Sequence, residues 1–84
     1  MYYVYVLSSA MNGGIYIGCT KDLKKRLKTH NSGQVESTKK RLPVKLVYYE
    51  ACLDEKDAFH REKYLKTTYG RRYLKRRLQW YFTG

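Results

Sequence analysis

The sequence has only two cysteines, Cys19 and Cys52, and they form no CxxC pair. This spacing argues against a zinc site and against a disulfide framework, so both thiols are expected to be reduced. No apolar run approaches the length of a membrane-spanning helix. Met1 leads directly into a β-prone segment, without the charged and apolar regions of a signal peptide. These absences predict a cytoplasmic protein that does not enter a membrane.

Acidic residues are also scarce. Seven Asp and Glu stand against eighteen Lys and Arg, which gives a formal net charge of +11 at pH 7. This imbalance predicts a polyanionic partner, most simply nucleic acid, although the charge could instead serve solubility alone. A membrane surface is not the expected partner, because no segment predicts a helix with a broad apolar face free of acids.

The chain of 84 residues is too short for two independent cores. We therefore predict one domain over residues 1–84, monomeric by default. Tyrosine dominates the aromatic residues, with ten copies against one Trp and two Phe. Tyrosine packs like Phe but keeps a hydroxyl group for water or phosphate.

A hairpin is predicted at the start of the chain. Residues 2–7 and 15–18 are β-prone, and Asn12-Gly13 between them is a strong signal for a tight turn. If Asn12-Gly13 is a two-residue turn, Met11 pairs with Gly14. The parity of the strands then places Tyr3, Tyr5, Leu7, Tyr16 and Gly18 on one face of the sheet.

The first predicted helix carries two unusual residues on its inner face. Thr20 is suited to cap the helix, which Asn31 to Gly33 would end. Leu23, Arg26, Leu27 and His30 recur at the spacing of one helical face. Arginine and histidine on such a face call for a specific role.

The second half of the chain predicts one more strand and two helices. The strand covers 44–50, and the helices cover 54–69 and 71–82, with Gly70 between them as a helix stop. The inner face of the first of these helices would hold Ala58, Glu62, Leu65 and Tyr69. The order β-β-α-β-α-α predicts an α+β domain in which three helices flank a three-stranded antiparallel sheet.

The motif Tyr16-Ile17-Gly18, followed eight residues later by Arg26 and preceded by the strand Tyr3-Val4-Tyr5, resembles the GIY-YIG nuclease superfamily. The resemblance is to its small single-domain bacterial members and covers residues 1–73. The sequence departs from the family pattern at Tyr3, which replaces a glycine, and at Cys19, which replaces a lysine found in several relatives. An asparagine that some relatives carry is absent near Leu74.

The resemblance implies a role for each matching residue. Tyr5 and Tyr16 would flank the attacking water, and one of them would act as the base. Gly18 would give backbone clearance for the substrate, and Arg26 would grip the scissile phosphate. A planar guanidinium suits that role because it donates two parallel hydrogen bonds. His30 would help to orient the water.

Glu62 matches the carboxylate that holds one divalent cation in the family. One carboxylate with waters and substrate oxygens is a typical arrangement for Mg²⁺, and Mn²⁺ is the alternative ion. A tyrosine has an ordinary pKa of about 10, so acting as a base near neutrality requires nearby cations. Lys21, Arg26 and the metal ion could supply them.

These residues also have ordinary structural interpretations. Tyr5 and Tyr16 could be packing residues of the strands. Arg26 and Glu62 could form an ion pair between two helices, and His30 could be a cation at a helix C-terminus. The coincidence of all five on inner faces favours a functional site.

A basic stretch follows the first helix. Lys39, Lys40 and Arg41 come directly after two hydroxyl residues, and with Lys21 they are the expected contacts to the substrate backbone. A solvated loop is the alternative.

The sequence therefore predicts a metal-dependent endonuclease that hydrolyses phosphodiester bonds in DNA or structured nucleic acid. A basic nucleic-acid-binding module with the same fold and no catalysis is the second hypothesis. An assembly protein whose charge only confers solubility is the third.

Overall fold

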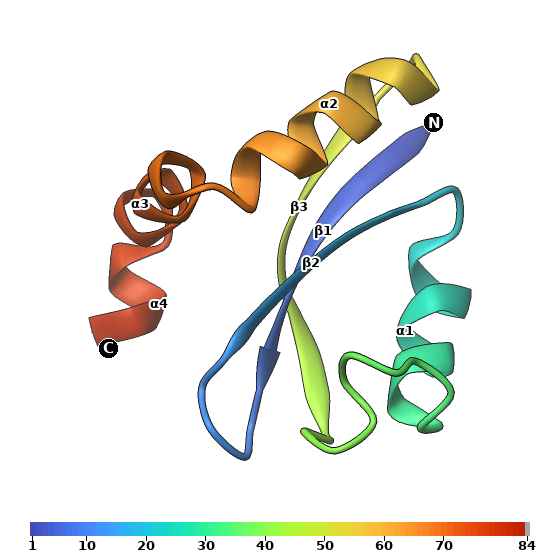
Figure 1. The fold of residues 1–84 in the computed structure, drawn as a ribbon, viewed down its shortest axis with the longest axis vertical. Helices are drawn as coiled ribbons and strands as arrows, with labels where there is room; N and C mark the ends of the chain where they lie inside the picture. Colours follow the sequence, from blue (N-terminus) through green and yellow to red (C-terminus); the bar gives the residue numbers. More distant parts are fainter. Residues whose placement is uncertain (84) are drawn as a thin grey trace.

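The computed structural model describes residues 1–83 (Figure 1). These residues form strands β1 (Tyr2–Ser9), β2 (Ile15–Thr20) and β3 (Val44–Cys52) and helices α1 (Leu23–Asn31), α2 (Glu55–Leu65), α3 (Thr68–Arg77) and α4 (Gln79–Thr83). The sheet is antiparallel with the order β2-β1-β3. The predicted α+β class and sheet are confirmed, with four helices in place of three. Within residues 1–83 no helix is both long and apolar enough to cross a membrane.

The hairpin between β1 and β2 has a longer loop than predicted. Ser9 and Gly14 close it, with Ser9 N donating to Gly14 O at 2.9 Å, and Gly13 has a φ of +70°. The predicted pairing of Met11 with Gly14 is therefore wrong. The register differs from the predicted one by two residues, and a shift of two leaves every side chain on its predicted face of the sheet. Tyr5 lies opposite Gly18, so the two residues share a face as predicted.

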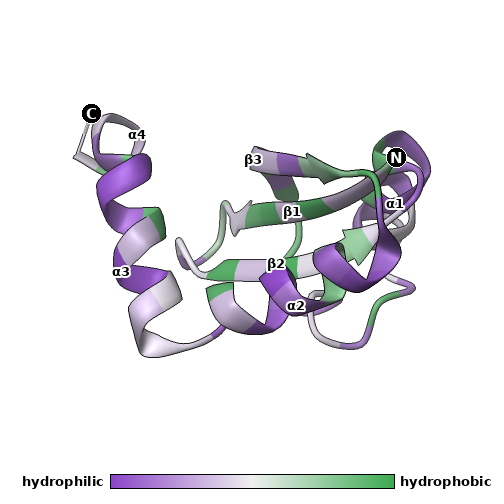
Figure 2. Cartoon of the chain, turned by 90° about the horizontal axis from the view of Figure 1, so that it is seen from above, coloured by the Kyte–Doolittle hydropathy of each residue, from purple (hydrophilic) through white to green (hydrophobic). Residues whose placement is uncertain are grey.

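The two faces of β1 pack against different helices. Val4 and Val6 form one buried cluster with Ala58 and Leu65 of α2. On the other face, Tyr5 and Leu7 form a second cluster, against which Leu23 and Leu27 of α1 pack. Figure 2, coloured by the hydropathy of each residue, shows that β1 is hydrophobic through its middle, whereas α3 is largely hydrophilic. The central strand is thus covered on both faces.

Helix α1 begins later than predicted. Its N-cap is Asp22, whose side chain accepts a hydrogen bond from Lys25 N at 3.1 Å. Thr20 instead ends β2, and its hydroxyl accepts from Asp22 N at 3.1 Å. Arg26 and His30 still lie one turn apart on the same helix, as the spacing predicted.

The prediction of one helix over 54–69 with Gly70 as its stop is wrong. Helix α2 ends at Leu65, and Thr67 caps α3 by accepting from Gly70 N at 3.1 Å. Gly70 lies inside α3, where a Cβ atom would strike Tyr64 O and the Cα of Leu65. The glycine therefore allows α3 to approach the end of α2 closely. Tyr69, predicted on the inner face, is 71% exposed.

The last predicted helix, over 71–82, is divided into α3 and α4 at Leu78. Tyr81 and Phe82, predicted to point inward, are 40% and 38% exposed. Leu74 is fully buried, as predicted. In both views α3 and α4 lie at the opposite end of the molecule from α1 (Figures 1 and 2).

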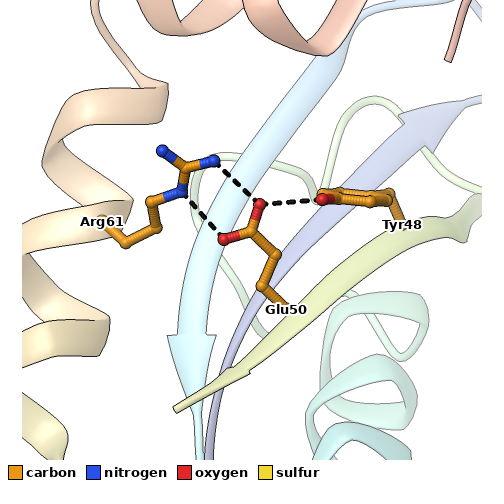
Figure 3. Close-up of polar contacts among 3 residues, drawn as sticks. All are labelled: Tyr48, Glu50 and Arg61. Carbon is orange, nitrogen blue, oxygen red and sulfur yellow. Dashed lines mark hydrogen bonds and ion pairs between the residues drawn. The ribbon is translucent and has the colours of Figure 1, made fainter. Parts of the chain in front are cut away.

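A polar network fastens α2 to β3 (Figure 3). Arg61 donates from Nε and Nη2 to the two carboxylate oxygens of Glu50 at 2.8 and 3.0 Å, and the Tyr48 hydroxyl donates to Oε2 at 2.8 Å. The hydrogen bonds from Arg61 hold the pKa of Glu50 below its ordinary value, and the Arg61 guanidinium also lies 4.8 Å from the centre of the Tyr73 ring. The network joins β3, α2 and α3, and it was not predicted from the sequence.

Candidate active site

The hydroxyl group of Tyr5 lies at the centre of the candidate site. Tyr5 is 3% exposed on the central strand β1 and faces α1. Arg26 Nε donates to its oxygen at 3.1 Å, and His30 Nε2 lies 3.0 Å from the same oxygen. Arg26 and His30 are four residues apart on α1, which places both side chains on one face of that helix. The unusual inner face predicted for this helix is thus used to hold one tyrosine.

His30 connects Tyr5 to a second hydroxyl group. It is 4% exposed, and its Nδ1 lies 2.8 Å from the Oγ1 of Thr38. Arg26 can only donate to the Tyr5 oxygen, and we assign the hydrogen of Tyr5 to the hydrogen bond with His30 Nε2. We therefore assign the remaining ring hydrogen to Nδ1, which donates to Thr38. Burial, together with the adjacent Arg26 guanidinium, holds the pKa of His30 below its ordinary value, which favours this neutral ring.

Thr38 belongs to the segment between α1 and β3 and is fully buried. Backbone hydrogen bonds to Val35 O shape the turn around it, and the Ser9 hydroxyl donates to Arg41 O at 2.6 Å. The segment is therefore attached to β1. Sequence reasoning missed Thr38, because nothing in the run of hydroxyl and basic residues marks the one that turns inward.

A hollow of about 250 Å³ opens beside Tyr5. Helix α2 contacts the edge strand β2, and its residues Phe59 and Glu62 line the hollow together with residues of α1. The structure brings together at this hollow the residues predicted for catalysis and the predicted glycine: Tyr5, Tyr16, Gly18, Arg26, His30 and Glu62. Four elements, β1, β2, α1 and α2, thus surround one space.

Gly18 lies directly beneath Tyr5. The two residues are register partners, and a Cβ atom on Gly18 would strike the hydroxyl end of the Tyr5 ring. The space above the glycine is thus taken by Tyr5, whereas the sequence predicted that it stays open for a substrate. The small residue allows the tyrosine to lie flat enough to reach Arg26 and His30.

Tyr16 and Cys19 line the hollow from β2. Within residues 1–83 no hydrogen bond of the Tyr16 hydroxyl is present, and this hydroxyl lies 3.4 Å from the position that a Cβ atom on Gly14 would take. Burial raises the pKa of the Cys19 thiol, and the nearby Glu62 carboxylate raises it further. A protonated, partly buried thiol is a poor nucleophile.

Glu62 forms its ion pair within its own helix. Its Oε2 lies 2.9 Å from the Nζ of Lys66, and its side chain is 20% exposed. Within residues 1–83 Glu62 and Arg26 form no ion pair, so that structural alternative is wrong. The side chain of Lys66 is 51% exposed, which leaves this pair near the solvent.

The donor set at Glu62 fits only one kind of metal site. Residues 1–83 contain no cluster of three or more His, Cys, Asp or Glu side chains able to hold an ion. A single carboxylate suits Mg²⁺, which keeps several of its waters and takes further oxygens from a phosphate. Lys66 would have to release the carboxylate on binding.

The four other cations predicted to contact the substrate lie outside the hollow. Lys21 is exposed, with its Nζ 5.3 Å from the centre of the Tyr2 ring, and Lys39 pairs with Glu36 at 2.9 Å. Lys40 and Arg41 are exposed beside Lys39. Their contact with a substrate stays a prediction.

The chain is similar to one protein family and to several bacterial proteins. The family model described as the GIY-YIG catalytic domain matches residues 1–82. A UPF0213 protein from Bacillus licheniformis is 46% identical over 66 residues, which are 77% of this chain and 67% of that protein. A UPF0213 protein from Bacillus pumilus is 45% identical over 67 residues, 79% of this chain and 67% of its own length. A UPF0213 protein from Lacticaseibacillus paracasei is 46% identical over 66 residues, which are 77% of this chain and 73% of that protein. No solved structure matches the chain significantly.

Proposed function

The chain belongs to the GIY-YIG family, and from this premise we propose that it is an endonuclease that hydrolyses phosphodiester bonds in DNA or structured nucleic acid with one divalent cation. One observation carries the proposal: the Tyr5 hydroxyl, at the wall of the hollow, is held between Arg26 Nε and His30 Nε2. Packing alone does not require a tyrosine hydroxyl to contact both a fixed cation and a neutral imidazole.

Tyr5 is the proposed base. Its hydroxyl hydrogen, held in a hydrogen bond to His30 Nε2, is released to solvent through the hollow when the base forms. The phenolate that remains is stabilised by the hydrogen bond from Arg26. The phenolate then takes a proton from the water that attacks phosphorus. Thr38 has a positioning role, because its oxygen accepts from Nδ1 and so keeps the hydrogen off Nε2.

Arg26 has a second proposed task. Its Nε is engaged by Tyr5, which leaves the two terminal amino groups of the guanidinium for phosphate oxygens. One residue would thus fix the base and the scissile phosphate relative to each other. Such positioning supplies much of the rate in phosphoryl transfer. Tyr16, which also lines the hollow, would orient the water.

Glu62 is the proposed protein ligand of the cation, which would be Mg²⁺ or Mn²⁺. When bound, the ion would neutralise charge on the phosphate oxygens and on the leaving alkoxide. Lys66 would compensate the Glu62 charge in the absence of the ion. The net charge of +11 supports a nucleic-acid substrate, and the two free cysteines suit the reducing cytoplasm. A monomer is sufficient for this site.

A binding module without catalysis is the second candidate. Its support is the Glu62–Lys66 ion pair, which neutralises the single carboxylate of the hollow. The deciding experiment incubates the purified protein with labelled single-stranded, duplex and branched DNA and with RNA, in Mg²⁺, Mn²⁺ or EDTA. Cleavage that needs the metal and disappears in Arg26→Ala supports the nuclease. Binding without cleavage on every substrate supports the module instead.

A further inference from the structure

A second basic surface lies on α3, away from the hollow. The sequence has no acidic residue after Glu62, whereas α3 carries five cations: Arg71, Arg72, Lys75, Arg76 and Arg77. None of the salt bridges within residues 1–83 involves α3. The positive charge of this helix is thus not compensated by an ion pair within the described chain, and most of its ribbon has the colour of hydrophilic residues in Figure 2. Such a surface attracts a polyanion.

Large aromatic side chains are exposed beside these cations. Trp80 of α4 is 80% exposed and is the only tryptophan of the chain. It borders an open hollow of about 430 Å³ whose other lining residues are Tyr73, Arg76, Arg77 and Gln79. An indole exposed to this extent forgoes the burial that normally stabilises such a side chain, so it calls for a partner.

We use the name α3–α4 face for the surface formed by this hollow and its lining residues. We propose that the α3–α4 face binds a single-stranded stretch of nucleic acid and stacks one of its bases on Trp80. Arg76 and Arg77 would contact the phosphates on either side. The proposal rests on the nucleic-acid substrate of the proposed function and adds a second contact region outside the catalytic hollow.

The chemistry of the α3–α4 face favours this ligand over others. The charge excludes a basic partner, and the arginines beside the indole match phosphates that alternate with flat bases. The bases of a duplex hide their faces in the stack, so only an unpaired nucleotide can offer one to Trp80. A single strand, a loop or a frayed end would therefore bind here, and a continuous duplex would not.

Trp80 is also its own probe, because no other tryptophan contributes to the fluorescence. The experiment titrates the protein in EDTA with an oligothymidylate, with an oligomer of abasic sites of equal length, and with a blunt duplex. The oligothymidylate should quench the Trp80 emission to saturation, whereas the abasic oligomer should bind more weakly and quench little. The duplex should also quench little.

Variants separate stacking from charge. Trp80→Leu, followed by the anisotropy of a labelled oligothymidylate, should lower the affinity by about 5- to 150-fold, the range of one base–aromatic stack. The matched control is Tyr49→Leu, which removes an aromatic residue that is 52% exposed on β3, outside the α3–α4 face, and should retain the affinity. Replacing Arg76 and Arg77 together with Gln should reduce the dependence of log K on log salt by about 1.4 for a single strand.

Three results would overturn the proposal: equal affinity of Trp80→Leu and the wild type, equal quenching by the abasic oligomer, or self-association that buries Trp80 in sedimentation. The last result would identify a second copy of the chain as the occupant. Cleavage measured on the same preparation reports on the proposed function separately. Quenching without cleavage would refute the nuclease alone, and cleavage without quenching would refute the α3–α4 face alone.

Discussion

Tyr5 and His30 meet edge to face, with ring centroids 5.7 Å apart, an interplanar angle of 77° and a distance of 3.0 Å from hydroxyl to Nε2. One lies on the central strand and the other near the end of α1, 25 residues later. Thr38 holds the far side of the imidazole from a third segment. The orientation of the candidate base is therefore fixed by tertiary packing around a single ring.

Replacing Thr38 tests this arrangement. Thr38→Val keeps the shape of a fully buried side chain but removes the acceptor of the His30 Nδ1 hydrogen. We expect the ring hydrogen to move to Nε2, which then cannot accept from Tyr5, and cleavage to fall by about 10²-fold or more. Thr38→Ser retains the hydroxyl and should retain most of the activity.

The tautomer itself can be measured. ¹⁵N chemical shifts of the His30 ring distinguish a hydrogen on Nδ1 from one on Nε2. Wild type and Thr38→Ser should give the Nδ1–H form, and Thr38→Val the other. If Thr38→Val loses activity with the tautomer unchanged, the role of Thr38 is structural and not one of proton positioning.

Gly18→Ala should displace Tyr5 without unfolding the protein. The added Cβ would strike the hydroxyl end of the Tyr5 ring, and overpacking of this kind typically costs about 1–3 kcal/mol. The melting temperature should fall by several degrees, and cleavage should fall as far as in Tyr5→Phe. The neighbouring Cys19→Ala, which removes a protonated thiol, should retain activity. If Gly18→Ala cleaves as well as the wild type, Tyr5 is not the base.

Local patterns predicted the sheet because its determinants are local. Asn12-Gly13 placed the hairpin, and alternation placed Tyr5 and Gly18 on one face. The loop begins two residues earlier than predicted, at Ser9 and not at Met11, a difference that preserves side-chain parity. The boundary at Gly70 was wrong for a different reason. Glycine stops many helices, but here it is required for close approach to Leu65, a contact between helices that no local pattern reveals.

The residues of the candidate site were predictable where local spacing or the family motif marks them. Arg26 and His30 followed from helical spacing, and Glu62 followed from the family resemblance. Thr38 did not, because its burial depends on how residues 32–43 fold back onto α1. The Glu62–Lys66 pair could have been predicted, since Lys66 stands four residues after Glu62 on the same helix.

The titration of His30 and of Glu50 should make the free energy of unfolding depend on pH in two separate ranges. The pKa of His30 in the native state lies below its ordinary value of 6.5, so the unfolded chain binds more protons below that pH. The free energy of unfolding should therefore decrease as pH falls below about 6.5. The pKa of Glu50 lies below 4.5, so its contribution is present above that pH and is lost as pH falls through the native pKa.

Urea unfolding at pH 7.5, 5.5 and 3.5 separates these contributions. His30→Gln should remove the loss between pH 7.5 and 5.5, and Glu50→Gln should reduce the loss between pH 5.5 and 3.5. His60→Gln, which replaces the exposed second histidine, is the control for the upper range. An upper-range loss that persists in His30→Gln would contradict the buried neutral imidazole.

The assignment of Glu62 as the metal ligand predicts how Glu62→Gln changes both stability and cleavage. Glu62 pairs with an exposed lysine, and such surface pairs contribute about 0–1 kcal/mol. Glu62→Gln should therefore lower the free energy of unfolding in EDTA by less than about 1 kcal/mol, while metal-dependent cleavage is lost. A buried pair with Arg26 would have made the same change cost about 3–5 kcal/mol.

Lys66→Met completes the test, because it removes the cation that competes for the carboxylate. The concentration of Mg²⁺ or Mn²⁺ needed for half-maximal cleavage should decrease in this variant, and it should increase beyond measurement in Glu62→Gln. The matched control is Glu36→Gln, which breaks an ion pair with Lys39 that lies outside the hollow and should leave the metal requirement unchanged. If Lys66→Met instead requires more metal, Lys66 supports the bound ion or its substrate. Glu62 then binds the metal with its lysine in place, and the proposed release of the carboxylate is wrong.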